Sequence, residues 1–208
     1  MQNSLKTDTK TYIFLARDSS FQRYCANILA SNGFLTHIII EEGSSLPNDN
    51  SSLTFKSLFL RMAWGNRTWH NKRIFIDGYD EFPNNISITR VKNINSQVTI
   101  SLIKTLEPNS IIVHGTRIIS EEVMSSAPYC NWLNIHWGLS PYYRGDGIMT
   151  PCAKKDWSKI GVTIHVLSKD IDGGKILAQQ IVKIDKHDNF YSLGIKMTKI
   201  ASRYLTEG

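Results

Sequence analysis

Two apolar runs flank a helical segment near the N-terminus, and this pattern constrains the fold more than any other. Lys10–Ala16 (KTYIFLA) and Leu35–Ile40 (LTHIII) are rich in β-branched and aromatic residues without polar alternation, which is typical of strands buried on both faces. Between them, apolar residues recur at helical spacing, with Ser19 or Ser20 as the N-cap and Gly33 just past the end. A strand–helix–strand unit of this kind predicts the opening of a parallel α/β sheet.

The rest of the chain continues the alternation of strands and helices. Further strands are predicted at Arg73–Ile76, Ile86–Val91, Asn109–Gly115, Trp132–His136, Ile160–Ser168 and Lys175–Ile184. Further helices are predicted at Leu53–Trp64, Ser96–Pro108, Ser120–Pro128, Ile148–Trp157 and Asn189–Leu205. No internal repeat or strong domain boundary interrupts them. We expect one Rossmann-like, doubly wound, mostly parallel α/β domain over residues 1–208. Residues 1–10 are expected to be a disordered tail. Whether the C-terminus is truncated stays open.

Composition and charge limit the cellular location and the binding partners that are expected. The three cysteines form no C-x-x-C pair, so the sequence supports neither a disulfide framework nor a zinc knuckle. The N-terminus lacks the apolar run of a signal peptide, and no segment is long enough to span a bilayer, so we expect a cytoplasmic protein without a membrane partner. The net charge of +6 fits either an anionic ligand, such as a phosphorylated small molecule, or an ordinary solvated surface. The basic residues are not clustered like a nucleic-acid arm, which disfavours a nucleic-acid partner.

The segment after the first strand reads ARDSSFQR and lacks G-x-G-x-x-G. A dinucleotide fingerprint is therefore absent, and NAD and FAD are not expected. In doubly wound sheets, ligands bind beyond the carboxyl ends of the strands. The loops after IIVHG, LNIH and TIHVL are thus the places where a site is expected.

The stretch LNIHWGLSPYYRGDG, Leu133–Gly147, places two polar side chains at a strand end. Asn134 and His136 are two residues apart, so on a strand they point to the same face. An amide donor beside an imidazole suits an acyl carbon under attack, because the amide can stabilise an oxyanion while the imidazole moves or holds a proton. An Asn-x-His pair alone is also compatible with two hydrogen-bonded residues at a strand end.

Further segments in the same order extend this motif. The loop after His136 carries Pro141, Tyr143, Arg144 and Gly145. It is followed by GVTIH, Gly161–His165, and by an Asp-x-Gly turn at Asp172 and Gly174. This series resembles the catalytic domain of the folate-dependent formyltransferases, which act on glycinamide ribonucleotide, methionyl-tRNA and amino sugars. The resemblance runs over roughly 12–205 and is sharp from 111 to 177.

The resemblance implies a catalytic triad of Asn134, His136 and Asp172. In that family an amine attacks the formyl carbon of 10-formyltetrahydrofolate. Asn134 would bind the oxyanion, His136 would take part in proton transfer, and Asp172 would orient the imidazole or accept the proton through water. Whether His136 or Asp172 is the base stays open. Asp170, a residue of the same turn, is the alternative to Asp172. The chemistry needs no metal.

The resemblance also implies a folate pocket formed by two loops. Arg117, Ile118 and Ile119 would offer backbone groups and an apolar wall to the pterin. Leu167 and Ile171 would bound the opposing loop. A place in the core is the alternative for Ile118 and Ile119.

Three residues are expected on the acceptor side of the site. Trp137 would narrow the site or stack on a sugar or base, with packing under the loop as the alternative. Tyr143 and Arg144 would face the acceptor or fix the loop. His165 is expected to be a structural histidine on a buried strand. His114 is expected either to pack in the core or to line the pocket, with neither alternative favoured.

The acceptor is expected to be the amino group of a nucleotide-linked amino sugar. The segment ARDSSFQR does not resemble the glycine-rich phosphate loop of the purine-pathway enzymes, and a C-terminal β-barrel like that of the methionyl-tRNA enzymes is not expected in 208 residues. Arg17 and the basic stretch 61–73 would meet the phosphates. The alternatives are a methionyl-tRNA formyltransferase-like enzyme, a formyl-folate hydrolase and a non-catalytic folate- or nucleotide-binding module. The oligomeric state, including a homodimer, stays open.

Overall fold

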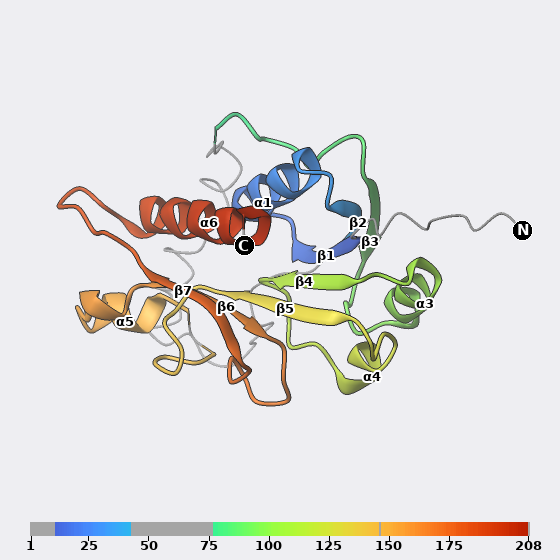
Figure 1. Cartoon of the computed structure of the whole chain (residues 1–208). Coiled ribbons are helices and arrows are strands. Elements are labelled where there is room, and N and C mark those ends of the chain that lie inside the picture. Colours follow the sequence, from blue (N-terminus) through green and yellow to red (C-terminus); the bar gives the residue numbers. More distant parts are fainter. Residues whose placement is uncertain (1–10, 43–76, 146, 208) are drawn as a thin grey trace, which may run out of the picture.

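The computed structural model describes residues 11–42, 77–145 and 147–207 (Figure 1). Its strands form one seven-stranded sheet in the order β3-β2-β1-β4-β5-β6-β7. The strands are β1 (Tyr12–Arg17), β2 (Leu35–Glu41), β3 (Ser87–Val91), β4 (Ser110–His114), β5 (Asn131–His136), β6 (Gly161–Val166) and β7 (Ile176–Ile181). The helices are α1 (Ser20–Ser31), α3 (Gln97–Leu106), α4 (Glu121–Met124), α5 (Met149–Ala153), η1 (Trp157–Lys159) and α6 (Phe190–Glu207).

The sheet is parallel from β3 to β5, whereas β6 and β7 run antiparallel to their neighbours. The predicted mostly parallel α/β fold is therefore confirmed. The helix predicted at Leu53–Trp64 and the strand predicted at Arg73–Ile76 lie outside the described residues. Ser19 is the N-cap residue of α1, but its side chain bonds Gln22 rather than a backbone N–H of the helix.

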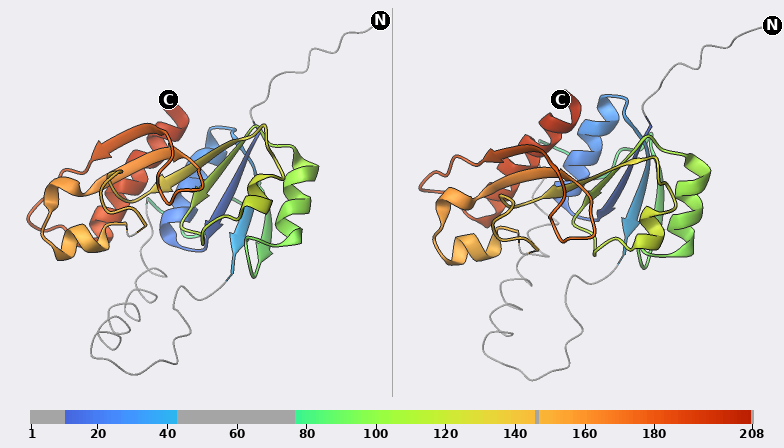
Figure 2. Two further views of the ribbon diagram at one scale, coloured as in Figure 1. Left: turned by 90° about the horizontal axis from the view of Figure 1, so that it is seen from below. Right: turned by 60° about the horizontal axis from the view of Figure 1, so that its bottom comes forward.

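Helices cover both faces of the sheet (Figures 1 and 2). On one face α1 and α6 lie side by side, and their apolar residues share a core with Phe14 and Ala16 of β1. On the other face α3 and α4 pack against Ile13 and Leu15. Successive side chains of a strand point to opposite faces, so the uninterrupted apolar run of β1 supplies both cores.

One buried carboxylate fixes the loops at the carboxyl edge of the sheet. The side chain of Glu41, at the end of β2, has no exposed surface. It accepts hydrogen bonds from the backbone N–H groups of Ile94 and Arg117, each at 3.0 Å. Its oxygens also pair with the guanidinium groups of Arg17 and Arg117. Glu41 thereby ties the ends of β1 and β2 to the loops that follow β3 and β4.

We expect Glu41→Gln to lower the free energy of unfolding by about 1–3 kcal/mol at pH 7, because the amide cannot satisfy both backbone donors and both cations. Burial opposes the charge of Glu41, but its two backbone donors and the two arginines hold its pKa below the ordinary 4.5. The stabilisation is therefore present above pH 4.5 and is lost as the pH falls through the lower pKa of the folded state.

Urea unfolding of the two proteins at pH 7 and at pH 3.5 measures this effect. The matched control is Glu42→Gln, which changes the exposed neighbouring carboxylate. A deficit of Glu41→Gln that equals the control at pH 7, or that does not shrink in acid, would contradict the role given to Glu41.

Candidate active site

Strand pairing brings the expected catalytic side chains together. Asn134 and His136 point to the same face of β5. The antiparallel partner β6 places His165 opposite Asn134 and Thr163 opposite His136. The turn after β6 then returns Asp172 to the same face, with a φ of 47° that Asp tolerates better than most residues. The predicted turn at Asp172 therefore carries its carboxylate back to β5.

The carboxylate of Asp172 is surrounded by hydrogen-bond donors. One oxygen, Oδ1, lies 3.1 Å from Asn134 Nδ2 and 3.3 Å from His165 Nε2. The other, Oδ2, lies 3.0 Å from His136 Nδ1 and accepts the backbone N–H of Gly145 at 2.8 Å. Burial alone would raise the pKa of Asp172, but these bonds and the two imidazoles hold it below its usual value. Asp172 is therefore an ionised acceptor.

The contact with Asp172 fixes the tautomer of His136. A carboxylate only accepts, so Nδ1 carries the hydrogen and the neutral ring has its lone pair on Nε2. This Nε2 is buried and has no hydrogen-bond partner in the described part of the chain. Burial lowers the pKa of His136, and Asp172 only partly offsets that effect. At neutral pH the site thus contains an uncharged imidazole with a free, basic nitrogen.

His165 was expected to be a structural histidine on a buried strand, and the structure places it against Asn134 and Asp172. These three residues and His136 form the Asp172 cluster. The ring of His165 is buried on β6, Nδ1 bonds the carbonyl of Val166 at 2.9 Å, and Nε2 touches both Asn134 and Asp172. Burial would lower the pKa of His165, but its bonds to Asp172 and Val166 raise it overall. No local signal in the sequence gives this contact, because His165 comes beside Asn134 only through the antiparallel pairing of β5 with β6.

Gly138 leaves open the space beside His136 Nε2. A Cβ atom at this position would overlap Nε2 and crowd the other ring atoms of His136. The loop is held in this place by Thr163, whose hydroxyl donates to the carbonyl of Gly138 at 2.6 Å and accepts the N–H of Ser140 at 3.2 Å. The absence of a side chain at residue 138 is thus a steric requirement of the His136 rotamer.

We expect Gly138→Ala to lower activity by about 10- to 100-fold while the fold persists, since displacing a packed ring typically costs about 1–3 kcal/mol. The measurement is the steady-state rate of the reaction proposed below, together with the circular dichroism of the variant. An unchanged rate would mean that the ring of His136 need not occupy its observed position.

The residues expected on the acceptor side have different positions. Tyr143 donates its hydroxyl to Asp156 at 2.8 Å, so it fixes the loop against the segment before η1. Arg144 is exposed, within electrostatic range of His165. Trp137 lies on the opposite face of the sheet from His136, where its ring meets Phe21 edge-on at a centroid distance of 4.7 Å. Packing is thus the role the structure gives to Trp137.

The residues expected around the folate lie in two different settings, the core and the surface. Ile119 is buried in the core beside α3 and α4, and Leu167 packs against the same core, so the packing alternative holds for Ile119. Arg117 pairs with Glu41. Ile118 and Ile171 are exposed over 69% and 52% of their surface. These two apolar side chains are therefore available to a ligand.

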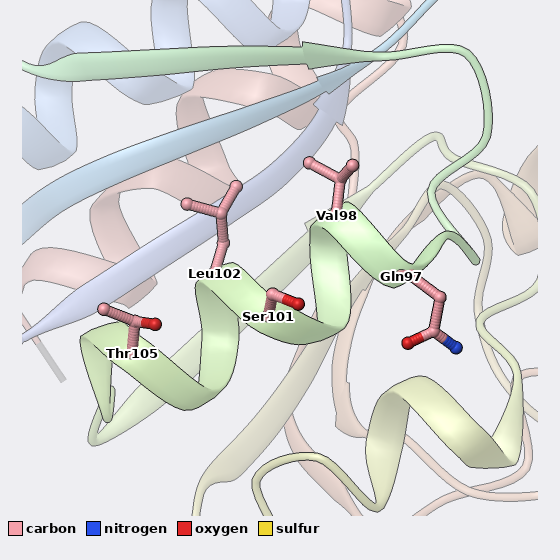
Figure 3. A pocket seen from close by; sticks show the side chains of 5 residues that line it. All are labelled: Gln97, Val98, Ser101, Leu102 and Thr105. Atoms are coloured by element: carbon pink, nitrogen blue, oxygen red, sulfur yellow. The ribbon is translucent and has the colours of Figure 1, made fainter.

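A shallow surface hollow lies elsewhere, along α3 (Figure 3). Its lining residues are Gln97, Val98, Ser101, Leu102 and Thr105. None of them belongs to the Asp172 cluster.

Within residues 11–42, 77–145 and 147–207, no group of His, Cys, Asp and Glu side chains could hold a metal ion. Over the same ranges, no helix has the length and apolar character that crossing a membrane requires.

Comparison with known families gives a match over the part of the chain that contains the candidate site. Residues 80–207, which contain the whole Asp172 cluster, match the family model described as formyl transferase. A methionyl-tRNA formyltransferase of Ehrlichia canis is 31% identical over 124 residues, which are 60% of this chain and 41% of the relative. The bifunctional polymyxin resistance protein ArnA of Wigglesworthia glossinidia brevipalpis is 35% identical over 121 residues, 55% of this chain and 17% of that protein. The matches thus span less than half of either relative.

Solved structures share the fold at low sequence identity. Glycinamide ribonucleotide transformylase 1 from Symbiobacterium toebii aligns with a TM-score of 0.65 and 14% identity, over 99% of this chain and 89% of its own. A 4-N formyltransferase from Francisella tularensis aligns with a TM-score of 0.56 and 18% identity, over 96% of this chain and 67% of its own. The fold of this chain is therefore shared with structures that are named as a transformylase and a formyltransferase.

Proposed function

This chain belongs to the formyl transferase family, and from that premise we propose that it moves a formyl group from 10-formyltetrahydrofolate to a primary amine through Asn134, His136 and Asp172. The observation that carries the proposal is Nε2 of His136, which is buried and has no hydrogen-bond partner among the described residues. The ring is held by Asp172 at 3.0 Å beside the amide of Asn134. A free basic nitrogen next to an amide donor is what acyl transfer to an amine requires.

The reaction balances with these groups. The amine nitrogen forms a bond to the formyl carbon, and the carbonyl oxygen becomes an oxyanion that an N–H of Asn134 stabilises. His136 Nε2 accepts the proton that the attacking amine loses. The bond between the formyl carbon and folate nitrogen N10 then breaks, and the imidazolium returns the proton to N10. The products are a formamide and tetrahydrofolate.

Asp172 orients His136 and does not act as the base. Four protein groups lie against its two oxygens, so neither oxygen is open to the substrate. Its pKa is held below the usual value although burial would raise it, and this agrees with that role, because a carboxylate stabilised by hydrogen bonds is a weaker base. Between the two alternatives left open by the motif, the geometry favours His136.

For the donor, the exposed Ile118 and Ile171 are the proposed contacts of the pterin, with the backbone of the loop at Arg117 beside them. Leu167 and Ile119 would support these loops from the core. Formyl transfer of this kind proceeds by positioning and oxyanion stabilisation, so the proposal includes no metal.

For the acceptor, a nucleotide-linked amino sugar is our proposal. Structures named as sugar N-formyltransferases share the fold, including one from Shewanella sp. FDAARGOS_354 with a TM-score of 0.56. The net charge of +6 favours an anionic substrate. Arg17, at the carboxyl end of β1, is partly exposed and would face such a substrate's phosphates. The methionyl-tRNA relatives make an aminoacyl-tRNA the second candidate.

Turnover of 10-formyltetrahydrofolate tests the proposal. The protein is incubated with the donor alone and with each of three amines: a nucleoside-diphosphate amino sugar, glycinamide ribonucleotide and methionyl-tRNA. Turnover that requires the amino sugar supports the proposal, and turnover that requires another amine reassigns the acceptor. Turnover without any amine would indicate a formyl-folate hydrolase, and binding without turnover a non-catalytic module.

A further inference from the structure

The side-chain nitrogen of Asn134 points at other protein groups, although the proposed reaction needs it to face the formyl oxygen. Nδ2 lies 3.1 Å from Asp172 Oδ1 and 3.1 Å from His165 Nε2. The reverse orientation would set the amide oxygen against the carboxylate, so the nitrogen must face both groups. When His165 is neutral, both N–H groups of Asn134 are then occupied within the protein. Stabilising an oxyanion requires one of them to turn toward the formyl oxygen.

His165 contacts Asn134 through the atom that titrates. The carbonyl of Val166 only accepts, so Nδ1 of His165 keeps its hydrogen in both charge states. Nε2 therefore gains or loses the proton, and this atom lies between Asn134 and Asp172. A neutral Nε2 accepts an N–H from Asn134. A protonated Nε2 donates to Asp172, and two donors cannot then share the 3.1 Å contact with Asn134 Nδ2.

We propose that His165 is a positioning residue whose protonated form turns the Asn134 amide about its terminal torsion, so that one N–H faces the formyl oxygen. The neutral form of His165 retains that N–H inside the cluster. This inference rests on the proposed function, because the released N–H is the one that the oxyanion would use. Asn134 touches the reacting atoms in this scheme, whereas His165 acts only through Asn134.

Charged and titratable groups face His165 from three segments. Asp172 approaches from the loop after β6, His136 from β5 with ring centroids 6.4 Å apart, and Arg144 from the loop after β5. Asp172 favours the proton on His165, whereas Arg144 opposes it. A charge on His165 in turn lowers the pKa of His136. The reactive combination is thus a charged His165 beside a neutral His136.

The dependence of kcat/KM on pH tests this scheme in the active protein. We expect a rate that falls in acid, as His136 is protonated, and falls about tenfold per pH unit in base, as His165 loses its proton. In His165→Leu the alkaline limb should vanish, because nothing then holds the second N–H of Asn134. His114→Leu, which removes the buried histidine of β4, should keep that limb. A purely structural His165 would lower the rate equally at every pH.

Nuclear magnetic resonance of the wild-type protein gives a second test that does not depend on activity. The side-chain ¹⁵N–¹H signals of Asn134, assigned by their loss in Asn134→Ala, should shift with the midpoint at which His165 titrates. Asn134 signals that stay constant while His165 titrates would overturn the inference. Coupled signals without formyl transfer would refute the proposed function alone, and transfer without an alkaline limb would refute the inference alone.

Discussion

His136→Ala is expected to lower kcat/KM for formyl transfer by about two to four orders of magnitude while the fold persists. The variant removes the lone pair that accepts the amine proton, and no other base in the described part of the chain is held by Asp172 with a free nitrogen. His165 cannot replace it, because both of its ring nitrogens already have partners.

The measurement is steady-state turnover of 10-formyltetrahydrofolate with saturating amine, compared with the thermal unfolding of each protein. His187→Ala is the matched control, since it removes an exposed histidine from the turn before α6. A His136→Ala protein within a few-fold of the wild-type rate would show that proton transfer uses another group.

Asp172→Asn is expected to lower kcat by about 10²- to 10⁴-fold. The amide has almost the same shape as the carboxylate, but it presents a donor where four protein groups, at least three of them donors, now converge. If its NH₂ faces His136, the ring must move its proton to Nε2 and loses the basic lone pair there. The KM for the amine should change less than kcat, because the carboxylate acts in the transition state.

Asp170→Asn is the control for this variant, because it changes an exposed carboxylate two residues earlier in the same turn. Equal effects of the two substitutions would mean that the turn, and not the carboxylate of Asp172, matters for the rate. A normal kcat in Asp172→Asn would contradict the tautomer assigned to His136.

Local patterns predicted the centre of the framework because strands such as β1, β2 and β4 are buried on both faces. The uninterrupted apolar run of β1 and the helical spacing before Gly33 define their elements without help from the rest of the chain. The pair Asn134 and His136 was predictable for the same reason, since alternation along one strand sets both on one face. The position of Asp172 came from the family resemblance, and the Asp172 cluster agrees with it.

Other features of the site depend on contacts between distant segments. His165 reaches Asn134 only because β6 turns antiparallel to β5, and no local periodicity encodes that choice. Glu41 finds its donors at residues 94 and 117, which come together only at the edge of the folded sheet. For Trp137 the two alternatives were the acceptor side and packing under the loop. Continuing the alternation one residue past His136 points its ring to the opposite face, which favours packing.

Following the carbon itself tests the central claim most directly. With 10-formyltetrahydrofolate labelled with ¹³C in the formyl group, and a nucleoside-diphosphate amino sugar as acceptor, the account predicts a labelled formamide on the sugar nitrogen, formed by wild-type protein and almost lost in His136→Ala. Label that appears only in free formate, or a formamide made equally well by both proteins, would contradict it.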